Sequence, residues 1–457
     1  MNRVTRRTWL IGIFIGILVG GLAFFLWEYA TQAEDWVRFP GSPHLYNNNN
    51  LGCGTVEDRN GEMLLDIGDE RSYSSDSDTR KSTLHWLGDR KGFIKAAAVA
   101  NYSAAMAGYN KIDGIYSRDG SAGVASLTLS AKVQNAALEA MKGKKGVVAV
   151  YNYKTGEILC ALTAPNYDPN DPPELGENPP EEYEGLYINR FVQSAYIPGS
   201  IFKIVTASAA LENVPDILDR KFTCTGSVKY GEEKVTCEKS HGKQTLKEAF
   251  AHSCNCAFAQ IAELVGKENM VKFVGQTGVT EPLSFDGITT AAGNYDISDT
   301  APVSFAWSCI GQHTDLVNPA RYLAFVGAVA GGGTGAQPHL VEQVRAGETV
   351  TYQAETVMSK QLLSPETAKI IGEYMRNNVK TVYGDENFSG LRVCAKSGTS
   401  QVGGGKTSNS MFAGFVADEQ YPLAFFAAVE NGGYGSKTCV PIIGKVLAQC
   451  KAVMDGE

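Results

Sequence analysis

Ser200 and Lys203 form the residue pair of this sequence with the clearest capacity for covalent chemistry. They open the segment SIFKIVTASAAL, which is apolar nearly all round, as expected for a helix buried in a core. Lys203 lies one helical turn after Ser200, so both side chains share a face. Burying a lone ammonium is costly unless it is paired or deprotonated. A desolvated lysine can take the proton of a serine hydroxyl, so the pair indicates a serine nucleophile with a lysine base.

The same spacing arises when a surface lysine follows a serine at a helix N-cap, so this pair alone is weak evidence. The apolar surroundings and the preceding Pro198-Gly199 turn favour the reactive interpretation. Two further segments follow: Ser253-Cys254-Asn255 opens a predicted helix, and Lys396-Ser397-Gly398-Thr399 lies on a predicted strand. In this order the three segments resemble the active-site motifs of the penicillin-binding protein and serine β-lactamase superfamily.

The resemblance extends beyond these motifs and covers about residues 50–457. Gly54–Leu64 looks like the opening of a class B, monofunctional penicillin-binding protein just outside its membrane anchor. The region between this opening and the catalytic domain is short, so the resemblance implies a reduced pedestal and no N-terminal glycosyltransferase domain. Three other segments look like landmarks of a transpeptidase domain: Tyr196–Lys203, Leu162–Asn170 and Ser308–Gln312.

The resemblance implies a role for each matched side chain. Ser200 would attack the carbonyl of a D-Ala-D-Ala stem peptide and form an acyl-enzyme, with Lys203 as the base. Ser253 would relay a proton to the leaving D-Ala, and Asn255 would bond the amide side chain of the substrate. Lys396 would supply positive potential near the terminal carboxylate and keep Lys203 neutral by like-charge repulsion.

The strand of the third motif is expected to bind the substrate. The hydroxyls of Ser397 and Thr399 would contact the terminal carboxylate, and Gly398 would be small because substrate lies along the strand edge, as in strand addition. The N–H groups of Ser200 and Thr399 would form the oxyanion hole, a device worth about 3 kcal/mol per donor in other acyl-transfer enzymes. The implied activity is a peptidoglycan D,D-transpeptidase, with some D,D-carboxypeptidase activity, inhibition by β-lactams and no cofactor.

The elements predicted to position these residues belong to an α+β fold, an antiparallel sheet flanked by helices with a helical subdomain. An Asn-Gly turn predicts a hairpin over residues 54–64. The predicted helices cover residues 90–108, 127–143, 199–211, 253–265, 319–329, 365–379 and a segment from Pro441. The predicted strands cover residues 146–153, 157–164, 391–399, 411–418 and 422–430.

The N-terminus reads as a membrane anchor, because Trp9–Trp27 is an uncharged run about as long as a bilayer is thick. Three arginines precede it and acidic residues follow, which places the N-terminus in the cytoplasm and the catalytic domain outside. A cleaved signal peptide is the competing interpretation, with Thr31-Gln32-Ala33 as a weak cleavage site. The predicted parts are a cytoplasmic tail (1–7), a transmembrane signal anchor (8–27), a juxtamembrane linker (28–50), a small accessory region (51–125) and a transpeptidase domain (126–457).

Ten cysteines in an exported chain raise the question of disulfides. Cys224 and Cys237 bracket a short segment and form the candidate pair, whereas Cys160 and Cys394 lie in apolar strands and read as core residues. Cys254 and Cys256 are two apart on a predicted helix, and no His–Cys set has the sequence spacing of a zinc site, so no metal site is predicted.

Two other activities share the acylation residues. A membrane-bound serine β-lactamase would hydrolyse the acyl-enzyme, but the Glu-x-x-Leu-Asn motif of class A enzymes is absent from the sequence. A non-catalytic β-lactam sensor would be acylated without processing peptidoglycan, and the motifs leave it open. Two segments match reactive motifs only in part. Lys154-Thr155-Gly156 precedes Ser200 and is interpreted as a plain turn. Gly403–Thr407 resembles a phosphate-binding loop but lacks the first glycine of that motif.

The net charge of the chain and the spacing of glycines in its anchor indicate which binding partners to expect. The net charge is −8 with no basic block, which argues against nucleic acid as a partner. Gly12, Gly16 and Gly20 recur every four residues and would form a small-residue face for another membrane helix, although glycine is common in such helices. The family resemblance implies a membrane glycosyltransferase as the partner that this face would contact.

Overall fold

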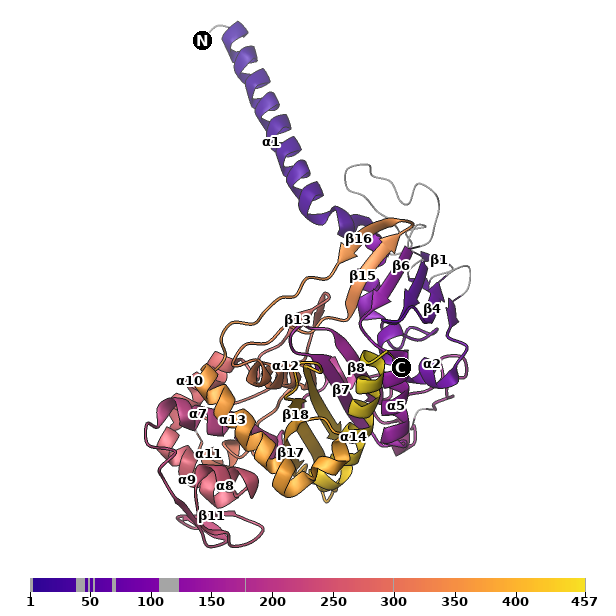
Figure 1. Ribbon diagram of the computed structural model, residues 1–457. Helices are drawn as coiled ribbons and strands as arrows, with labels where there is room; N and C mark the ends of the chain where they lie inside the picture. Colours follow the sequence, from indigo (N-terminus) through magenta and orange to yellow (C-terminus); the bar gives the residue numbers. More distant parts are fainter. Residues whose placement is uncertain are drawn as a thin grey trace.

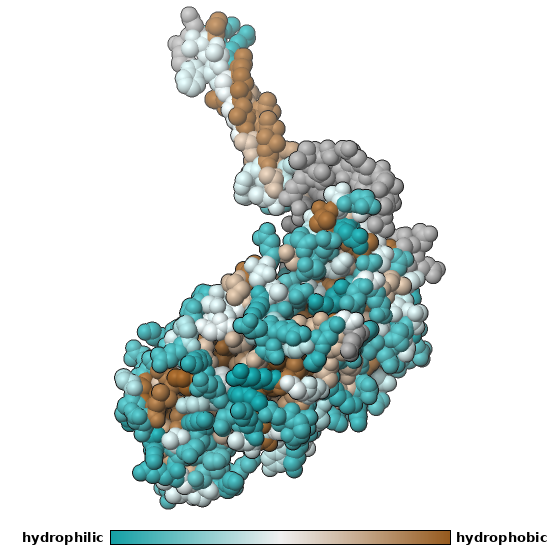
Figure 2. All heavy atoms as spheres, viewed as in Figure 1, coloured by the Kyte–Doolittle hydropathy of each residue, from teal (hydrophilic) through white to brown (hydrophobic). Residues whose placement is uncertain are grey.

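The computed structural model of the protein describes residues 3–37, 46–47, 50–51, 54–67, 71–106, 123–176, 178–298 and 300–456. A long helix, α1 (Arg3–Val37), projects from a body of sheets and helices (Figure 1). Among the described residues it is the one helix long and apolar enough to cross a membrane. Its apolar side chains are exposed, whereas the body is mostly hydrophilic on the face in view (Figure 2). Such exposure fits a helix surrounded by lipid.

A five-stranded antiparallel sheet lies at the centre of the body, in the order β17-β18-β19-β7-β8. Every residue of β7, β8, β18 and β19 is buried, because helices cover both faces. This explains why these strands read as continuous apolar runs. The strands are β7 (Gly146–Asn152), β8 (Ile158–Ala164), β17 (Val393–Ser400), β18 (Asn409–Val416) and β19 (Leu423–Val429).

The two faces of this sheet belong to two hydrophobic cores. Val148 packs in the core that includes α5 (Ala131–Met141) and α14 (Gly435–Met454). Its neighbour Val147 points to the opposite face, because side chains alternate along a strand. That second core includes α7 (Lys203–Asn213) and α12 (Pro319–Ala330). The α7 helix is therefore enclosed, as its apolar sequence predicted.

A six-stranded sheet occupies the end of the body from which α1 projects (Figure 1). Its order is β16-β15-β6-β3-β4-β5, and β3 runs parallel to β6. The sheet contains strands from both sides of the predicted domain boundary at residue 126, because two of its strands follow residue 340 in the chain. Its strands are β3 (Gly54–Glu57), β4 (Met63–Ile67), β5 (Arg71–Tyr73), β6 (Gly123–Leu127), β15 (Val341–Ala346) and β16 (Thr349–Gln353).

A group of helices and small hairpins lies beside the β17 edge of the central sheet, with β11 at its outer end (Figure 1). The helices are α8 (Leu246–Ala251), α9 (Asn255–Val265), α10 (Lys267–Thr277) and α11 (Pro302–Ser308). The hairpin strands are β9 (Phe222–Cys224), β10 (Ser227–Tyr230), β11 (Glu233–Thr236) and β12 (Gly242–Gln244). Strand β9 pairs with β12, and β10 pairs with β11.

The remaining elements connect these parts. The α-helices are α2 (Ser77–Leu87), α3 (Ala97–Asn101), α4 (Ser103–Met106), α6 (Arg190–Gln193) and α13 (Pro365–Asn378). The short helices are η1 (Glu181–Tyr183), η2 (Gly199–Phe202), η3 (Val379–Tyr383) and η4 (Asp385–Phe388). The two-residue strands are β1 (Tyr46–Asn47), β2 (Asn50–Leu51), β13 (Ser284–Phe285) and β14 (Ile288–Thr289).

The predicted α+β fold, the hairpin over residues 54–64 and the strands of the central sheet are confirmed. Three helix predictions need correction. The anchor helix continues to Val37, into the stretch predicted as a linker. Two short helices, α3 and α4, replace the predicted helix over residues 90–108, and α14 begins before Pro441. Pro441 therefore lies inside α14, although an interior proline removes one hydrogen bond of the helix.

Candidate active site

The turn into α7 places Ser200 at the junction of three structural parts. Gly199 takes a positive φ of 56°, and its N–H donates to the Gly311 carbonyl at 2.8 Å. A Cβ on Gly199 would lie 2.7 Å from the Thr399 carbonyl, and one on Gly311 would lie 2.2 Å from the Gly199 carbonyl. Backbone therefore touches backbone at both contacts, which only glycine permits. The result is that Ser200 lies against β17 and against the segment after α11.

The Lys203 amine lies at the centre of the candidate site. Its Nζ is 3.0 Å from Ser200 Oγ and 3.1 Å from Ser253 Oγ. It also lies 2.7 Å from the Ser253 carbonyl and 2.7 Å from Asn255 Oδ1. The first two predicted motifs therefore meet in space, although about fifty residues separate them in the chain.

Lys203 is fully buried, and this burial lowers its pKa to about 8. Negative charge on Cys237, Cys254, Glu238 and Cys256 acts in the opposite direction. A neutral amine fits the contacts well, since it has two N–H donors and one lone pair. The donors match the carbonyl of Ser253 and the amide oxygen of Asn255, which leaves the lone pair for the hydroxyl of Ser200.

Ser253 occupies an unusual backbone position between α8 and α9. It takes a positive φ of 51°, and its N–H donates to the Phe250 carbonyl at 3.2 Å. This turn directs its carbonyl and its hydroxyl toward Lys203. Cys254 is the N-cap of α9, so the predicted helix start is correct to within two residues. Positive φ in a residue other than glycine costs free energy, which the surrounding contacts of Ser253 must offset.

The third motif joins the first two through Lys396. Its Nζ lies 3.0 Å from Ser253 Oγ and 2.9 Å from the Ser397 carbonyl. Lys396 is buried, and burial together with the charge of Lys203 lowers its pKa well below the usual value. The hydroxyl of Ser253 therefore lies between two amines, at 3.1 and 3.0 Å. All five residues predicted as catalytic are within one connected set of contacts.

The other residues of the third motif, Ser397, Gly398 and Thr399, lie close to protein groups outside the first two motifs. Ser397 and Thr399 are partly exposed, and their hydroxyls contact the Tyr383 hydroxyl at 3.0 Å and the Gly435 N–H at 3.4 Å. A Cβ on Gly398 would lie 2.9 Å from the Pro198 carbonyl. The small residue is thus required by the approach of the Ser200 turn, which corrects the interpretation that substrate alone requires it.

Two residues of the site, Tyr383 and Gln312, were given no role from the sequence. The buried Tyr383 hydroxyl accepts the Ser397 N–H at 2.8 Å. The Gln312 amide donates to the Thr399 carbonyl at 2.8 Å, which gives a structural role to the end of the Ser308–Gln312 landmark. Both side chains bind the outer edge of β17, the edge strand of the central sheet. No motif marks Tyr383, because its position depends on how η3 packs beneath β17.

The Thr399 N–H has the orientation that an oxyanion donor needs. Successive residues of an antiparallel strand direct their main-chain groups to opposite sides in the plane of the sheet. The main-chain groups of Ser397 bond to side chains off the sheet, so the N–H of Thr399, two residues on, also faces away from β18. The Gln312 contact with the Thr399 carbonyl agrees with this orientation.

The cysteine predictions have mixed outcomes. Cys160 and Cys394 are buried, as predicted for core residues. Cys224 and Cys237 are free thiols in the structure, which corrects the predicted disulfide. Both join a cluster with His241 and Cys254, whose ligand atoms lie within 4.8 Å of one another. The four residues come from separate turns and strands, and among them only Cys237 and His241 are close in the sequence.

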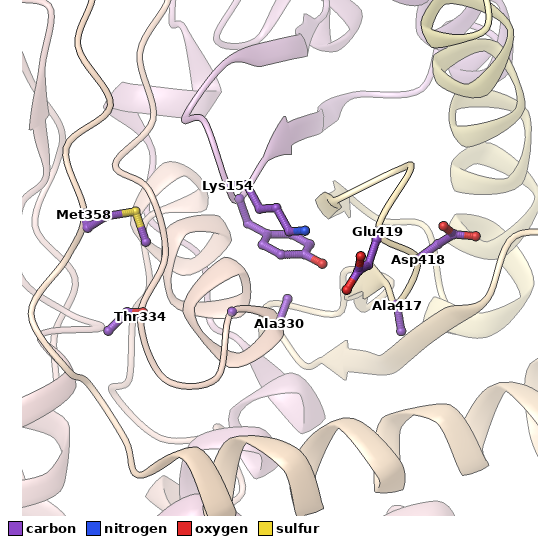
Figure 3. Close-up of a pocket in the computed structure, with 9 residues that line it drawn as sticks. Lys154, Ala330, Thr334, Met358, Ala417, Asp418 and Glu419 are labelled. Atoms are coloured by element: carbon purple, nitrogen blue, oxygen red, sulfur yellow. The ribbon is translucent and has the colours of Figure 1, made fainter.

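Lys154-Thr155-Gly156 has the same Lys-Ser/Thr-Gly pattern as the third motif, but it lies elsewhere in the structure. Lys154 lines a cavity of about 360 Å³ together with Ala330, Ala417 and Glu419, and Figure 3 shows these side chains around it. Ala417 follows the end of β18 that pairs with Val393, whereas the Thr399 end of β17 pairs with Ser410. The cavity is therefore at the opposite end of the sheet from Ser200, and none of the predicted catalytic residues lines it.

Comparisons with known proteins agree with this geometry. Residues 146–448 match the family model described as the penicillin binding protein transpeptidase domain. The chain is 29% identical to Stage V sporulation protein D of Bacillus subtilis, over 83% of this chain and 59% of that protein. It is 25% identical to the peptidoglycan D,D-transpeptidase PbpA of Mycolicibacterium smegmatis, over 69% of each.

A solved structure gives the same fold. Penicillin-binding protein A from M. tuberculosis, as a penicillin G acyl-enzyme complex, superposes with a TM-score of 0.74 at 21% identity. The match covers 88% of this chain and 99% of that one. At 21% identity this likeness shows a shared fold and nothing about activity. The chain also spans less than two thirds of the length of the sporulation protein, so the activity of that whole relative does not transfer by itself.

Proposed function

The chain belongs to the family of penicillin-binding protein transpeptidases, and on that premise we propose that it is a membrane-anchored peptidoglycan D,D-transpeptidase. Its substrates are stem peptides that end in D-Ala-D-Ala, and β-lactams acylate and inhibit it. The observation that carries this proposal is the Lys203 amine, held 3.0 Å from Ser200 Oγ in a buried site. PbpA of Mycolicibacterium smegmatis is named for the same reaction.

Acylation begins when Lys203 accepts the proton of Ser200. The Ser200 oxygen attacks the carbonyl of the penultimate D-Ala, and the tetrahedral intermediate carries negative charge on the former carbonyl oxygen. The N–H groups of Ser200 and Thr399 are the proposed donors to that oxygen, since the Ser200 turn and β17 meet there and the Thr399 N–H faces outward.

Collapse of the intermediate requires a proton on the leaving D-Ala. Ser253 Oγ is the proposed relay, because it contacts both Lys203 and Lys396. Its hydroxyl can donate to the leaving amine while it accepts from an amine behind it. The acyl-enzyme is then attacked by an amine of a second stem peptide, which forms the cross-link and frees Ser200. Attack by water instead gives the carboxypeptidase product.

Substrate binding uses the outer edge of β17. The terminal carboxylate of the donor peptide would contact the hydroxyls of Ser397 and Thr399, replacing their contacts with Tyr383 and Gly435. Asn255 holds its amide oxygen on Lys203 and donates through Nδ2 to the Thr236 carbonyl, so its side chain is fixed in place to face a substrate amide. Lys396 lies behind this strand, where its Nζ contacts the Ser397 carbonyl and the Ser253 hydroxyl.

The anchor determines where this chemistry takes place. We propose the parts that the sequence indicated: a cytoplasmic tail at 1–7, a membrane span at 8–27, a short accessory region and an extracytoplasmic transpeptidase domain. The positive residues before the span and the acidic ones after it support this orientation. The glycines of the span are exposed on α1, which leaves their face available for a membrane glycosyltransferase partner.

The test of the proposed function is release of D-Ala. The full-length protein in detergent is incubated with polymerised peptidoglycan strands that carry pentapeptide stems, and D-Ala and cross-linked dimers are measured. We expect both products, and we expect penicillin added beforehand to suppress both. Acylation by penicillin without any D-Ala release would point to a sensor, and rapid penicillin hydrolysis would point to a β-lactamase.

The acylation rate is predicted to depend on pH through Lys203. Only the neutral amine can accept the Ser200 proton, and its pKa is about 8 in the folded protein. The second-order rate constant for penicillin acylation should rise about tenfold per pH unit well below that value and level off above it. Stopped-flow measurement from pH 6 to 9.5 checks this, and a flat profile would contradict a lysine base.

A further inference from the structure

A cluster of soft metal-ligating side chains lies directly behind the Ser253-Cys254-Asn255 motif. Cys224 ends β9, Cys237 follows β11, His241 precedes β12, and Cys254 is the N-cap of α9. Their four ligand atoms all lie within 4.8 Å of one another. In the chain, these residues are distributed over thirty positions, so folding alone brings them together.

Three distances within the cluster are close to those of a tetrahedral zinc site. Zinc takes thiolate sulfur at about 2.3 Å and imidazole nitrogen at about 2.0–2.1 Å, so tetrahedral angles imply sulfur–sulfur separations of about 3.8 Å and sulfur–nitrogen separations of about 3.6 Å. The structure has 3.9 Å between the sulfurs of Cys237 and Cys254. His241 Nδ1 is 3.6 Å from Cys224 Sγ and 3.5 Å from Cys237 Sγ.

The surroundings hold these atoms in place. Cys224 and Cys254 are fully buried, and Cys237 and His241 are partly buried. The Ala257 N–H donates to Cys254 Sγ at 3.4 Å, a contact that would stabilise a metal-bound thiolate at the start of a helix. The His241 ring stacks on His252 with the centroids 5.1 Å apart and the planes 10° from parallel, so its Nδ1 stays directed at the sulfurs.

The local fold also needs a cross-link. Of the eight residues in the hairpin strands β10 and β11, only Val235 is buried. A segment with so small a core gains stability from disulfides or from a metal. A ligand set of three cysteines and one histidine is typical of a structural zinc site.

We propose that Cys224, Cys237, His241 and Cys254 bind one zinc ion, and that this ion positions Ser253 and Asn255 in the active site. The ion would join the loops of the β9–β12 region to the start of α9. With Zn²⁺, three thiolates and a neutral imidazole give the bound site a net charge of −1.

The link to the active site is covalent and short. Cys254 lies between Ser253 and Asn255, and both of these residues contact Lys203 Nζ. On the other side of the cluster, Thr236 precedes Cys237 and its carbonyl accepts the Asn255 Nδ2–H at 3.0 Å. A metal bound to Cys237 and Cys254 would therefore hold both the Asn255 backbone and the partner of its side chain.

The first test is the metal content of the intact protein. The full-length chain is purified in detergent under reducing conditions without added metal, and zinc is measured by mass spectrometry of the elements. We expect one equivalent per chain, and we expect replacement by cobalt to give the intense visible absorption of a tetrahedral thiolate site. Protein without bound zinc that also gives no such cobalt spectrum would overturn the proposal, as would a Cys224–Cys237 disulfide in the intact mass.

Variants test the ligand set. Cys224→Ser and His241→Ala should lose the zinc and the cobalt spectrum, while Cys439→Ser, which changes a buried thiol of α14 outside the cluster, should retain both. If a ligand variant fails to fold, the metal content of the wild type still decides the proposal. Retention of one tightly held zinc and an unchanged cobalt spectrum in both ligand variants would overturn it.

The positioning role rests on the proposed function and needs its own measurement. Removal of zinc by a chelator should slow penicillin acylation at least about tenfold, and zinc added back should restore the rate, by analogy with groups that orient catalytic ligands. An unchanged rate in zinc-free protein would overturn the positioning role. Absence of acylation in the zinc-loaded protein would instead mean that the proposed function itself is wrong.

Discussion

Replacement of Ser200 by alanine is expected to abolish covalent attachment of penicillin to this protein. The hydroxyl is the proposed nucleophile, and its Oγ lies 3.0 Å from the amine that would accept its proton. Without that oxygen no acyl bond can form, so the loss should be complete. Intact mass of the full-length protein after incubation with penicillin measures the result directly, since each adduct adds the mass of one inhibitor.

Ser208→Ala is the matched control for this experiment. Ser208 lies on the same helix, α7, and its hydroxyl bonds only to the Ile204 carbonyl within that helix. We expect this variant to form the adduct as the wild type does. An adduct on the Ser200→Ala protein, located by peptide mapping at another serine, would show that the nucleophile has been assigned to the wrong residue.

Replacement of Lys203 by methionine is expected to slow acylation by about 100-fold to 10,000-fold, the usual contribution of a positioned general base. Methionine has a similar length and no charge, so it fills the buried space without leaving a cavity. It cannot accept the Ser200 proton or bond to Ser253 and Asn255. The rate of adduct formation with a fluorescent penicillin measures the effect.

Lys267→Met provides the comparison for Lys203. The Lys267 amine donates to the Thr300 carbonyl at 2.6 Å and lies outside the predicted motifs, so its loss should leave acylation nearly unchanged. Thermal unfolding of both variants separates a chemical effect from a loss of structure. If Lys203→Met were acylated as fast as the wild type, the base would have to be sought at Lys396, which contacts Ser253 on the other side.

The candidate catalytic residues could be named from the sequence because their chemistry is local. Ser200 and Lys203 are one helical turn apart on an apolar helix, and a lysine in such a place needs an explanation. Ser253 and Asn255 flank the start of the next helix, and Lys396 lies in an apolar strand. The order of the three motifs then supplied the specificity that no single motif has.

Other features depended on contacts between distant parts of the chain. Tyr383 bonds to Ser397 only because η3 lies under β17. Gly398 is required by the approach of Pro198, not by the strand in which it lies. The six-stranded sheet joins segments from both halves of the chain, so a domain boundary placed at residue 126 divides a single sheet.

The cysteine cluster is the clearest feature that could not be predicted from the sequence. Spacing rules for zinc recognise ligands that a short turn brings together, such as pairs separated by two to four residues. Here Cys237 and His241 are near each other in the chain, but Cys224 and Cys254 arrive from other elements. The sequence by itself therefore indicated the candidate nucleophile, its candidate base and the fold class, since helical and strand periodicity acts over a few residues. The tertiary structure alone decided which distant side chains share one site, because those contacts follow from packing, and packing has no period in the sequence.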